Sequence, residues 1–227
     1  MTAVAKRGIE TAADLLDRIQ HLGSIPPYRV LLRPTPGEAT EADLLSHAKR
    51  TKRLCELVDG VLVEKATGYG EACLAGWLVM CLSDYLLSRD LGCLAGAGGT
   101  VRLRKDLVRA PCLSFLGWDK MPNGQFDMRP IGRIIPDLAI EIIRAGNTKA
   151  EFERKIGEYF CAGVQAVWIV DHFHRVVVVH TSADDFVALK ETDTLDGGTV
   201  FPGLDLPLAR IFEVVPPTKK RTRRKKL

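Results

Sequence analysis

Two carboxylates lie in the apolar segment RIIPDLAIEIIR, residues 133–144, which otherwise has the composition of a buried strand. Asp137 and Glu141 share one face of such a strand, because side chains alternate, but they stand roughly 13 Å apart along it. One metal ion with ligand distances of about 2.1–2.5 Å cannot bind both directly. Because an unpaired buried carboxylate is costly, we expect a cation, a metal ion or a set of hydrogen-bond donors to meet Glu141, near the carboxyl end of the strand. Asp137, at the strand entry after Pro136, is expected to serve another purpose.

The segment that follows supplies a candidate cation. TKAEFERKIGEYFCA, residues 148–162, has apolar side chains at helical spacing and ends at Gly163, a residue that favours helix ends. Lys155 flanks the apolar stripe and could swing back over the strand end toward Glu141. It could equally extend its ammonium group into water, as surface lysines do. The spacing leaves both interpretations open.

The surrounding elements predict a mixed α/β protein. Apolar periodicity indicates helices, β-rich runs meet at the turn Asp59-Gly60, and a strand, helix, strand unit over 135–170 should cross over right-handedly. We expect helices over 9–21 after a Thr11 cap, from about Thr40, over 70–88 and over 148–162, and strands in CELVDGVLVEK, VRLRKDLVRAPCLSFLGW, IIPDLAIEII and VQAVWIVDHFHRVVVVHT.

Composition limits the class of protein. The chain has 227 residues, 46% hydrophobic and 26% charged, as expected of one ordinary domain with small extensions. The longest apolar stretch, Ala72 to Leu82, is shorter than the about 20 residues of a membrane span, and residues 1–18 lack an apolar signal core. We therefore expect a cytoplasmic protein with no membrane partner. Six scattered cysteines without a CxxC pair argue against a zinc site and a disulfide framework.

The basic character is confined to the end of the chain. The last nine residues, KKRTRRKKL, carry seven Lys or Arg, which leaves 25 basic against 28 acidic side chains in residues 1–218. Such a run is usually a solvated, disordered arm, and the alternative is an arm that binds nucleic acid or another polyanion. The candidate nucleic-acid contacts in it are Lys219, Lys220, Arg221, Arg223 and Arg224.

Several motifs in sequence order resemble the Uma family of endonucleases, a restriction endonuclease-like branch of the PD-(D/E)xK superfamily. They are ATEADLL, LVDGVLVEKATGYGE, VRAPCLSF, IPDLAIEIIRAGNTKAEFERKIGEYFCAGVQAVWIVD, DTLDGG and FPGLDLPL. The resemblance covers roughly residues 25–213 and implies a restriction endonuclease-like mixed sheet flanked by helices. It divides the chain into an N-terminal helical extension, 1–24, the endonuclease-like domain, 25–213, and a basic disordered tail, 214–227.

The resemblance also implies a metal-dependent phosphodiesterase. In such cores two carboxylates hold Mg²⁺ or Mn²⁺, and the metal and a lysine polarise the scissile phosphate and activate the attacking water. Glu141 then corresponds to the second acid. The usual lysine position, two residues later, holds Ile143, so Lys155 on the next helix is the substitute that the family pattern suggests. Glu64 and Glu71 are candidates for an extra ligand, with a solvated or capping role as the alternative.

Two departures from the family pattern fall at this site. Where the pattern VRxPDxSF has the first acid, this chain has Cys112, and a thiol suits zinc or another soft ion better than Mg²⁺. Where the family commonly has Ser-Pro, this chain has Arg144-Ala145. Arg144 could bind phosphate or could occupy the space of a metal. The candidate metal ligands are therefore Glu141, Cys112 and Glu64. Asp137 is a candidate that would support the metal site without binding the ion directly.

Three hypotheses follow. The first is a DNA endonuclease dependent on Mg²⁺ or Mn²⁺, with Glu141 and Lys155 central and with activity impaired by Cys112. The second is a catalytically inactive nucleic-acid-binding protein that keeps the nuclease fold and uses its basic tail for affinity. The third is a structural or interaction protein with no nucleic-acid role. DNA is the expected partner, and a homodimer is left open.

Overall fold

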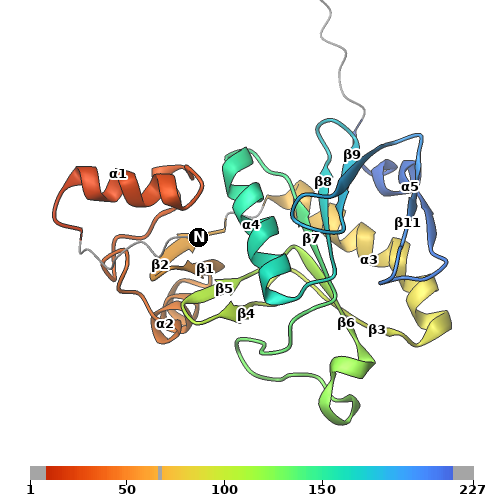
Figure 1. Cartoon of the computed structure of the whole chain (residues 1–227), viewed down its shortest axis with the longest axis horizontal. Coiled ribbons are helices and arrows are strands. Elements are labelled where there is room, and N and C mark those ends of the chain that lie inside the picture. Colours follow the sequence, from red (N-terminus) through yellow and green to blue (C-terminus); the bar gives the residue numbers. More distant parts are fainter. Residues whose placement is uncertain (1–8, 66–67, 217–227) are drawn as a thin grey trace, which may run out of the picture.

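A six-stranded mixed sheet forms the centre of the molecule (Figure 1). The computed structural model describes residues 9–65 and 68–216. In spatial order the strands are β10 (Phe186–Lys190), β9 (Val176–His180), β8 (Ala166–Asp171), β7 (Leu138–Ile142), β6 (Leu113–Gly117) and β3 (Gly92–Ala95). β7 and β8 pair in parallel and are joined by α4 (Lys149–Ala162), which confirms the predicted strand, helix, strand unit.

A smaller four-stranded antiparallel sheet lies beside the first. Its order is β2 (Val61–Glu64), β1 (Cys55–Val58), β5 (Leu107–Arg109) and β4 (Val101–Arg104). The predicted hairpin turn is present, since Asp59 and Gly60 both have positive φ, 50° and 75°. A Cβ atom at Gly60 would lie 2.4 Å from the carbonyl oxygen of Gly37, so this turn packs against a neighbouring loop as well as reversing the chain.

The remaining elements cover the sheets. They are α1 (Ala12–His21), α2 (Glu41–Thr51), α3 (Tyr69–Arg89), α5 (Leu208–Phe212), the 3₁₀ turns η1 (Pro27–Arg29), η2 (Trp118–Lys120) and η3 (Pro122–Gly124), and a hairpin of β11 (Thr194–Asp196) and β12 (Asp205–Pro207). Thr11 and Thr40 cap α1 and α2 in reciprocal hydrogen bonds with Asp14 and Asp43. Gly163, with φ of 100°, ends α4 as expected.

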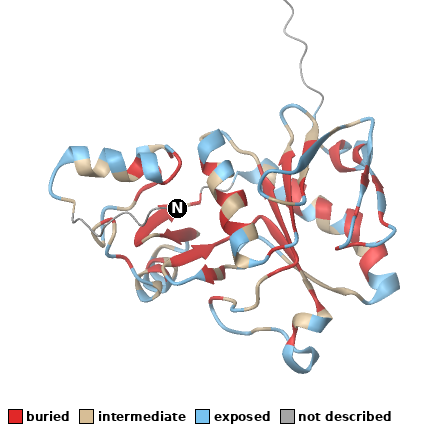
Figure 2. Cartoon of the chain, in the orientation of Figure 1, coloured by how far each residue is buried: buried red, intermediate tan, exposed pale blue. Residues whose placement is uncertain are grey.

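The two faces of the central sheet carry separate cores. Leu138 and Ile140 of β7 pack in the cluster that includes α3 and α5, whereas Ala139 packs in the cluster of α1, α4 and the smaller sheet. Figure 2 shows buried residues along both sheets and on the facing sides of α3 and α4. Because side chains alternate, Glu141 shares the face of Ala139, between α4 and the smaller sheet.

Helix α3 lies against the first of these cores. By length and composition alone it could cross a membrane, a property that core helices of globular proteins share, and Leu78 and Leu82 are fully buried within the protein. The sequence-based expectation rested on the unbroken apolar stretch alone. That stretch is shorter than the whole helix and too short to span a membrane.

Candidate active site

Glu141 is 2% exposed and is met by four groups. The ammonium of Lys65 lies 2.9 Å from Oε2, and that of Lys155 lies 3.3 Å from Oε1. The hydroxyl of Tyr159 donates to Oε1 at 2.9 Å, and the thiol of Cys112 lies 3.5 Å from Oε2. Of the partners expected for this buried carboxylate, a cation, a metal ion or a set of donors, the structure shows two cations and one hydroxyl donor.

Local structure explains why these groups converge. Cys112 immediately precedes β6, whose Leu113 pairs with Ile140 of β7, so the antiparallel register brings Cys112 opposite Glu141. Lys155 and Tyr159 are four residues apart on α4 and therefore lie on one face of the helix. The turned-in interpretation of Lys155 is the correct one, because its side chain is 3% exposed.

A second buried carboxylate extends the site into the smaller sheet. Glu56 of β1 is fully buried and lies 3.1 Å from Lys155 Nζ, 2.7 Å from Arg109 Nη1 and 4.0 Å from Lys65 Nζ. Arg109 of β5 also donates from Nε to Glu158 of α4 at 2.8 Å. We call these six residues the buried ion network: Glu56, Lys65, Arg109, Glu141, Lys155 and Glu158. The network joins both sheets and α4.

The network sets the charge states of its members. Burial alone would raise the pKa of Glu141, but the positive charges of Lys155 and Lys65 outweigh it and hold that pKa at about 2. Burial likewise opposes ionisation of Glu56, yet Lys155, Arg109 and Lys65 hold its pKa well below its usual range. Burial works to lower the pKa of Lys155, and Glu141 and Glu56 more than compensate. Lys155 is therefore charged at neutral pH and can stabilise negative charge but cannot act as a base.

Tyr159 contributes a neutral hydrogen-bond donor. Burial, together with the nearby charges of Glu141 and Glu56, raises the pKa of its hydroxyl well above the ordinary value. Tyr159 is fully buried on the apolar side of α4. Its hydroxyl nevertheless belongs to the site.

Arg144 covers the thiol that replaces the first acid. Its Nη2 lies 3.1 Å from Sγ of Cys112, and the backbone amide of Ile142 donates to the same sulfur at 3.4 Å. Cys112 is buried and Arg144 is half-buried. Of the two roles expected for Arg144, this geometry favours occupation of the space beside Glu141.

Asp137 lies at the strand entry and is held by other partners. It forms an ion pair with Lys120 at 2.6 Å and accepts hydrogen bonds from the amide of Gly117 at 2.8 Å and the side chain of Gln165 at 2.5 Å. The separate purpose expected for Asp137 is thus to fix the start of β7. The structure does not bring it to Glu141.

The other predicted site residues are not joined to the network. Glu64 is half-buried at the end of β2 and forms an ion pair with the exposed Arg53 at 2.9 Å. Glu71 lies in the first turn of α3. The predicted nucleic-acid contacts Lys219, Lys220, Arg221, Arg223 and Arg224 lie outside the described residues.

Four members of the buried ion network were missed in the sequence: Glu158 of α4, and Glu56, Lys65 and Arg109 of the smaller sheet. The last three each carry a charge within or beside a β-rich run, in CELV, VLVEK and LVRAP. That is the same signal that singled out Glu141, and it could have been applied to these runs.

The side chains at Glu141 do not fit a magnesium ion. Mg²⁺ requires near-octahedral oxygen coordination. Oε2 of Glu141 and the carbonyl oxygen of Ala110 both accept from the ammonium of Lys65, and the first-acid position holds the Arg144-covered thiol of Cys112. Among residues 9–65 and 68–216, no three His, Cys, Asp or Glu side chains are grouped so that they could hold a metal ion. Metal binding at this centre remains a prediction that the arrangement of cations opposes.

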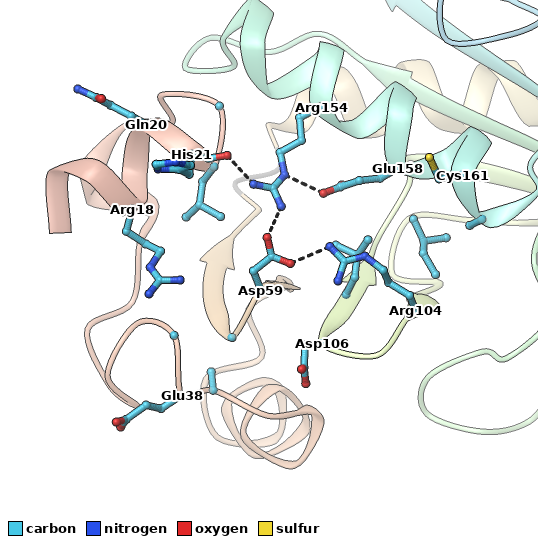
Figure 3. Close-up of a pocket in the computed structure, with 18 of the residues that line it drawn as sticks. Arg18, Gln20, His21, Glu38, Asp59, Arg104, Asp106, Arg154, Glu158 and Cys161 are labelled. Atoms are coloured by element: carbon cyan, nitrogen blue, oxygen red, sulfur yellow. Dashed lines mark hydrogen bonds and ion pairs between the residues drawn. The ribbon is translucent and has the colours of Figure 1, made fainter. Parts of the chain in front are cut away.

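A groove of about 1100 Å³ lies on the side of α4 that faces α1, separate from Glu141 (Figure 3). Figure 3 shows Asp59 between Arg104 and Arg154, at 2.8 Å and 2.5 Å. Arg154 also pairs with Glu158 at 2.7 Å, where the groove meets the buried ion network. The charged side chains of these ion pairs are thus neutralised by each other. None of the predicted site residues lines the groove.

The mixed sheet flanked by helices has the restriction endonuclease-like fold. The family model of Uma2, described as "Putative restriction endonuclease", matches residues 42–209, and the chain belongs to this family. The fold is similar to the crystal structure of a putative nuclease belonging to DUF820 from Anabaena variabilis. That similarity has a TM-score of 0.63 at 19% identity and covers 72% of this chain and 92% of the other. The search of curated proteins gave no match.

Proposed function

We propose that this protein is a DNA endonuclease of its family whose hydrolysis of phosphodiester bonds is impaired by its own side chains. Membership of a family of restriction endonucleases supports DNA as the substrate. The observation that carries the proposed impairment is the contact of 3.1 Å between Arg144 Nη2 and Cys112 Sγ, directly beside Glu141.

The site has positive charge that suits a phosphate but an incomplete set of ligands for a metal ion. Arg144 is half-buried with Nη2 on the thiol of Cys112, and a phosphate is a ligand that suits the planar arginine fork. Lys155 adds positive charge behind it, within the buried ion network. A divalent ion would polarise the phosphate and lower the pKa of the attacking water. With a thiol and a guanidinium at the first-acid position, we expect the wild-type chain to bind such an ion weakly.

Plasmid nicking in Mg²⁺ or Mn²⁺ tests this proposal. We expect the double variant Cys112→Asp/Arg144→Ser to nick DNA at least about 100-fold faster than the wild type, since it restores an oxygen ligand and removes the covering cation. Adding Glu141→Ala should abolish the gain. A wild-type rate equal to that of the double variant would refute the impairment, and nicking that survives Glu141→Ala would exclude this site.

A second candidate function is DNA binding without any hydrolysis. It is favoured by the two cations, Lys65 and Arg144, that lie against Glu141 and Cys112. It predicts that wild-type nicking equals that of Glu141→Ala, while metal-free protein still binds a labelled duplex in fluorescence anisotropy. If the basic tail supplies the affinity, deletion of residues 218–227 weakens binding and reduces its dependence on salt. Unchanged binding after this deletion would exclude the tail.

A further inference from the structure

Lys65 has the surroundings of a bound cation. Its side chain is 5% exposed, its ammonium contacts the carbonyl oxygen of Ala110, and it lies 2.9 Å from Glu141 Oε2. Glu56 Oε1 lies on a third side at 4.0 Å. Two carboxylates and a backbone carbonyl are hard oxygen donors, the kind that Mg²⁺ and Mn²⁺ take in proteins.

The charge of the buried ion network agrees with this view of Lys65. Its six side chains comprise three formal cations and three formal anions: Lys65, Arg109 and Lys155 against Glu56, Glu141 and Glu158. A divalent ion added to this set would leave uncompensated positive charge in a buried place, which is strongly unfavourable. Loss of the ammonium of Lys65 would remove one positive charge from this set and leave Glu141 Oε2 without its partner at 2.9 Å, which favours a cation in its place.

The geometry of the Lys65 ammonium suits the role of a bound cation. A lysine ammonium is a compact point charge with three donors, and here it donates to the carbonyl oxygen of Ala110, after β5, and to Glu141 of β7, while the carboxylate of Glu56 on β1 lies 4.0 Å away. Lys65 directly follows β2, so the hairpin of β1 and β2 delivers both Glu56 and Lys65 to the same place.

We propose that Lys65 is the built-in cation of this centre and occupies a latent divalent-cation site formed by the oxygens of Glu141, Glu56 and Ala110. Removal of its ammonium opens that site to Mn²⁺ or Mg²⁺. The inference concerns cation binding alone and holds whether or not the protein hydrolyses DNA.

Titration of Mn²⁺ into the full chain, followed by the loss of the free-ion electron paramagnetic resonance signal, tests the proposal. We expect Lys65→Met to bind one Mn²⁺ at least tenfold more tightly than the wild type, and the same addition to raise its melting temperature. Lys65→Gln, which keeps a donor for the Ala110 carbonyl, is the second variant if the methionine variant folds poorly. Lys120→Met is the matched control, because it removes a lysine that pairs with Asp137, away from this centre.

Two results would overturn the proposal. One is wild-type Mn²⁺ binding as tight as that of Lys65→Met and dependent on Glu141. The other is the absence of a gain in a Lys65→Met or Lys65→Gln protein that circular dichroism shows to be folded. The first result would also contradict the weak metal binding expected of the wild type under the proposed function, whereas the second concerns Lys65 alone. Because no DNA is present, a failure of plasmid nicking leaves this inference intact.

Discussion

Replacement of Arg109 by methionine is expected to lower the free energy of unfolding by about 3–5 kcal/mol. The guanidinium of Arg109 is 3% exposed and pairs with Glu56 and Glu158, which are 0% and 5% exposed in their side chains. Methionine keeps much of the volume but leaves two buried carboxylates short of a partner. Urea unfolding followed by circular dichroism measures the loss.

The matched control is Arg104→Met on the neighbouring strand of the same sheet. Arg104 pairs with Asp59 at 2.8 Å, but its side chain is 54% exposed. An exposed pair of this kind contributes at most about 1 kcal/mol. Equal losses from the two substitutions would contradict the claim that the buried ion network holds the two sheets together.

Acidification is expected to have the second large effect on stability. The pKa of Glu141 is held at about 2 in the folded protein, below its ordinary value of 4.5, and that of Glu56 is also lowered. A carboxyl group with a depressed folded pKa stabilises the fold fully above its unfolded pKa, and this contribution is lost as the pH falls toward the folded value. The urea midpoint should therefore be nearly constant from pH 7 to about 5 and fall steeply between about pH 5 and 2.

The variant Glu141→Gln separates this effect from general acid unfolding. Glutamine has the same shape and does not titrate, so the fall in the urea midpoint below pH 5 should be shallower in the variant than in the wild type, even if the variant is less stable at pH 7. A wild-type midpoint that stays level between pH 5 and pH 3 would show that the buried carboxylates do not carry this stability.

The elements that depend on local pattern were predictable from the sequence. The cap Thr11, the helix start near Thr40, the turn at Asp59 and the breaker Gly163 all lie where the pattern places them. The reason is physical: turns and caps are decided by a few adjacent residues. The buried carboxylate Glu141 was found in the same way, because a charge within an apolar run requires a partner.

The partners of that charge were only partly predictable. Lys155 lies 14 residues after Glu141, on the helix that must cross over the same strand, so topology brings it near. Lys65 and Glu141 are 76 residues apart and meet only because the smaller sheet packs against α4 and β7. No local spacing in the sequence predicts that contact. For that reason Glu64 was named as a candidate metal ligand, and its inward-facing neighbour, Lys65, was missed.

The same limit applies to the role of Cys112. The sequence resemblance identifies it as the residue in the first-acid position, and the register of β6 and β7 brings it to Glu141 as expected. The guanidinium of Arg144 over its sulfur depends on how the loop after β7 folds back, which the strand pattern does not specify.

The central claim is that side chains of this protein occupy the space in which a nuclease of this class would hold a divalent ion. Anomalous diffraction from wild-type crystals soaked in Mn²⁺ tests it most directly, with the Cys112→Asp/Arg144→Ser protein as the positive control. We predict no Mn²⁺ peak at the carboxylate of Glu141 in the wild type and a peak between residues 112 and 141 in the variant. A wild-type peak bound by Glu141 and Cys112 would contradict the claim.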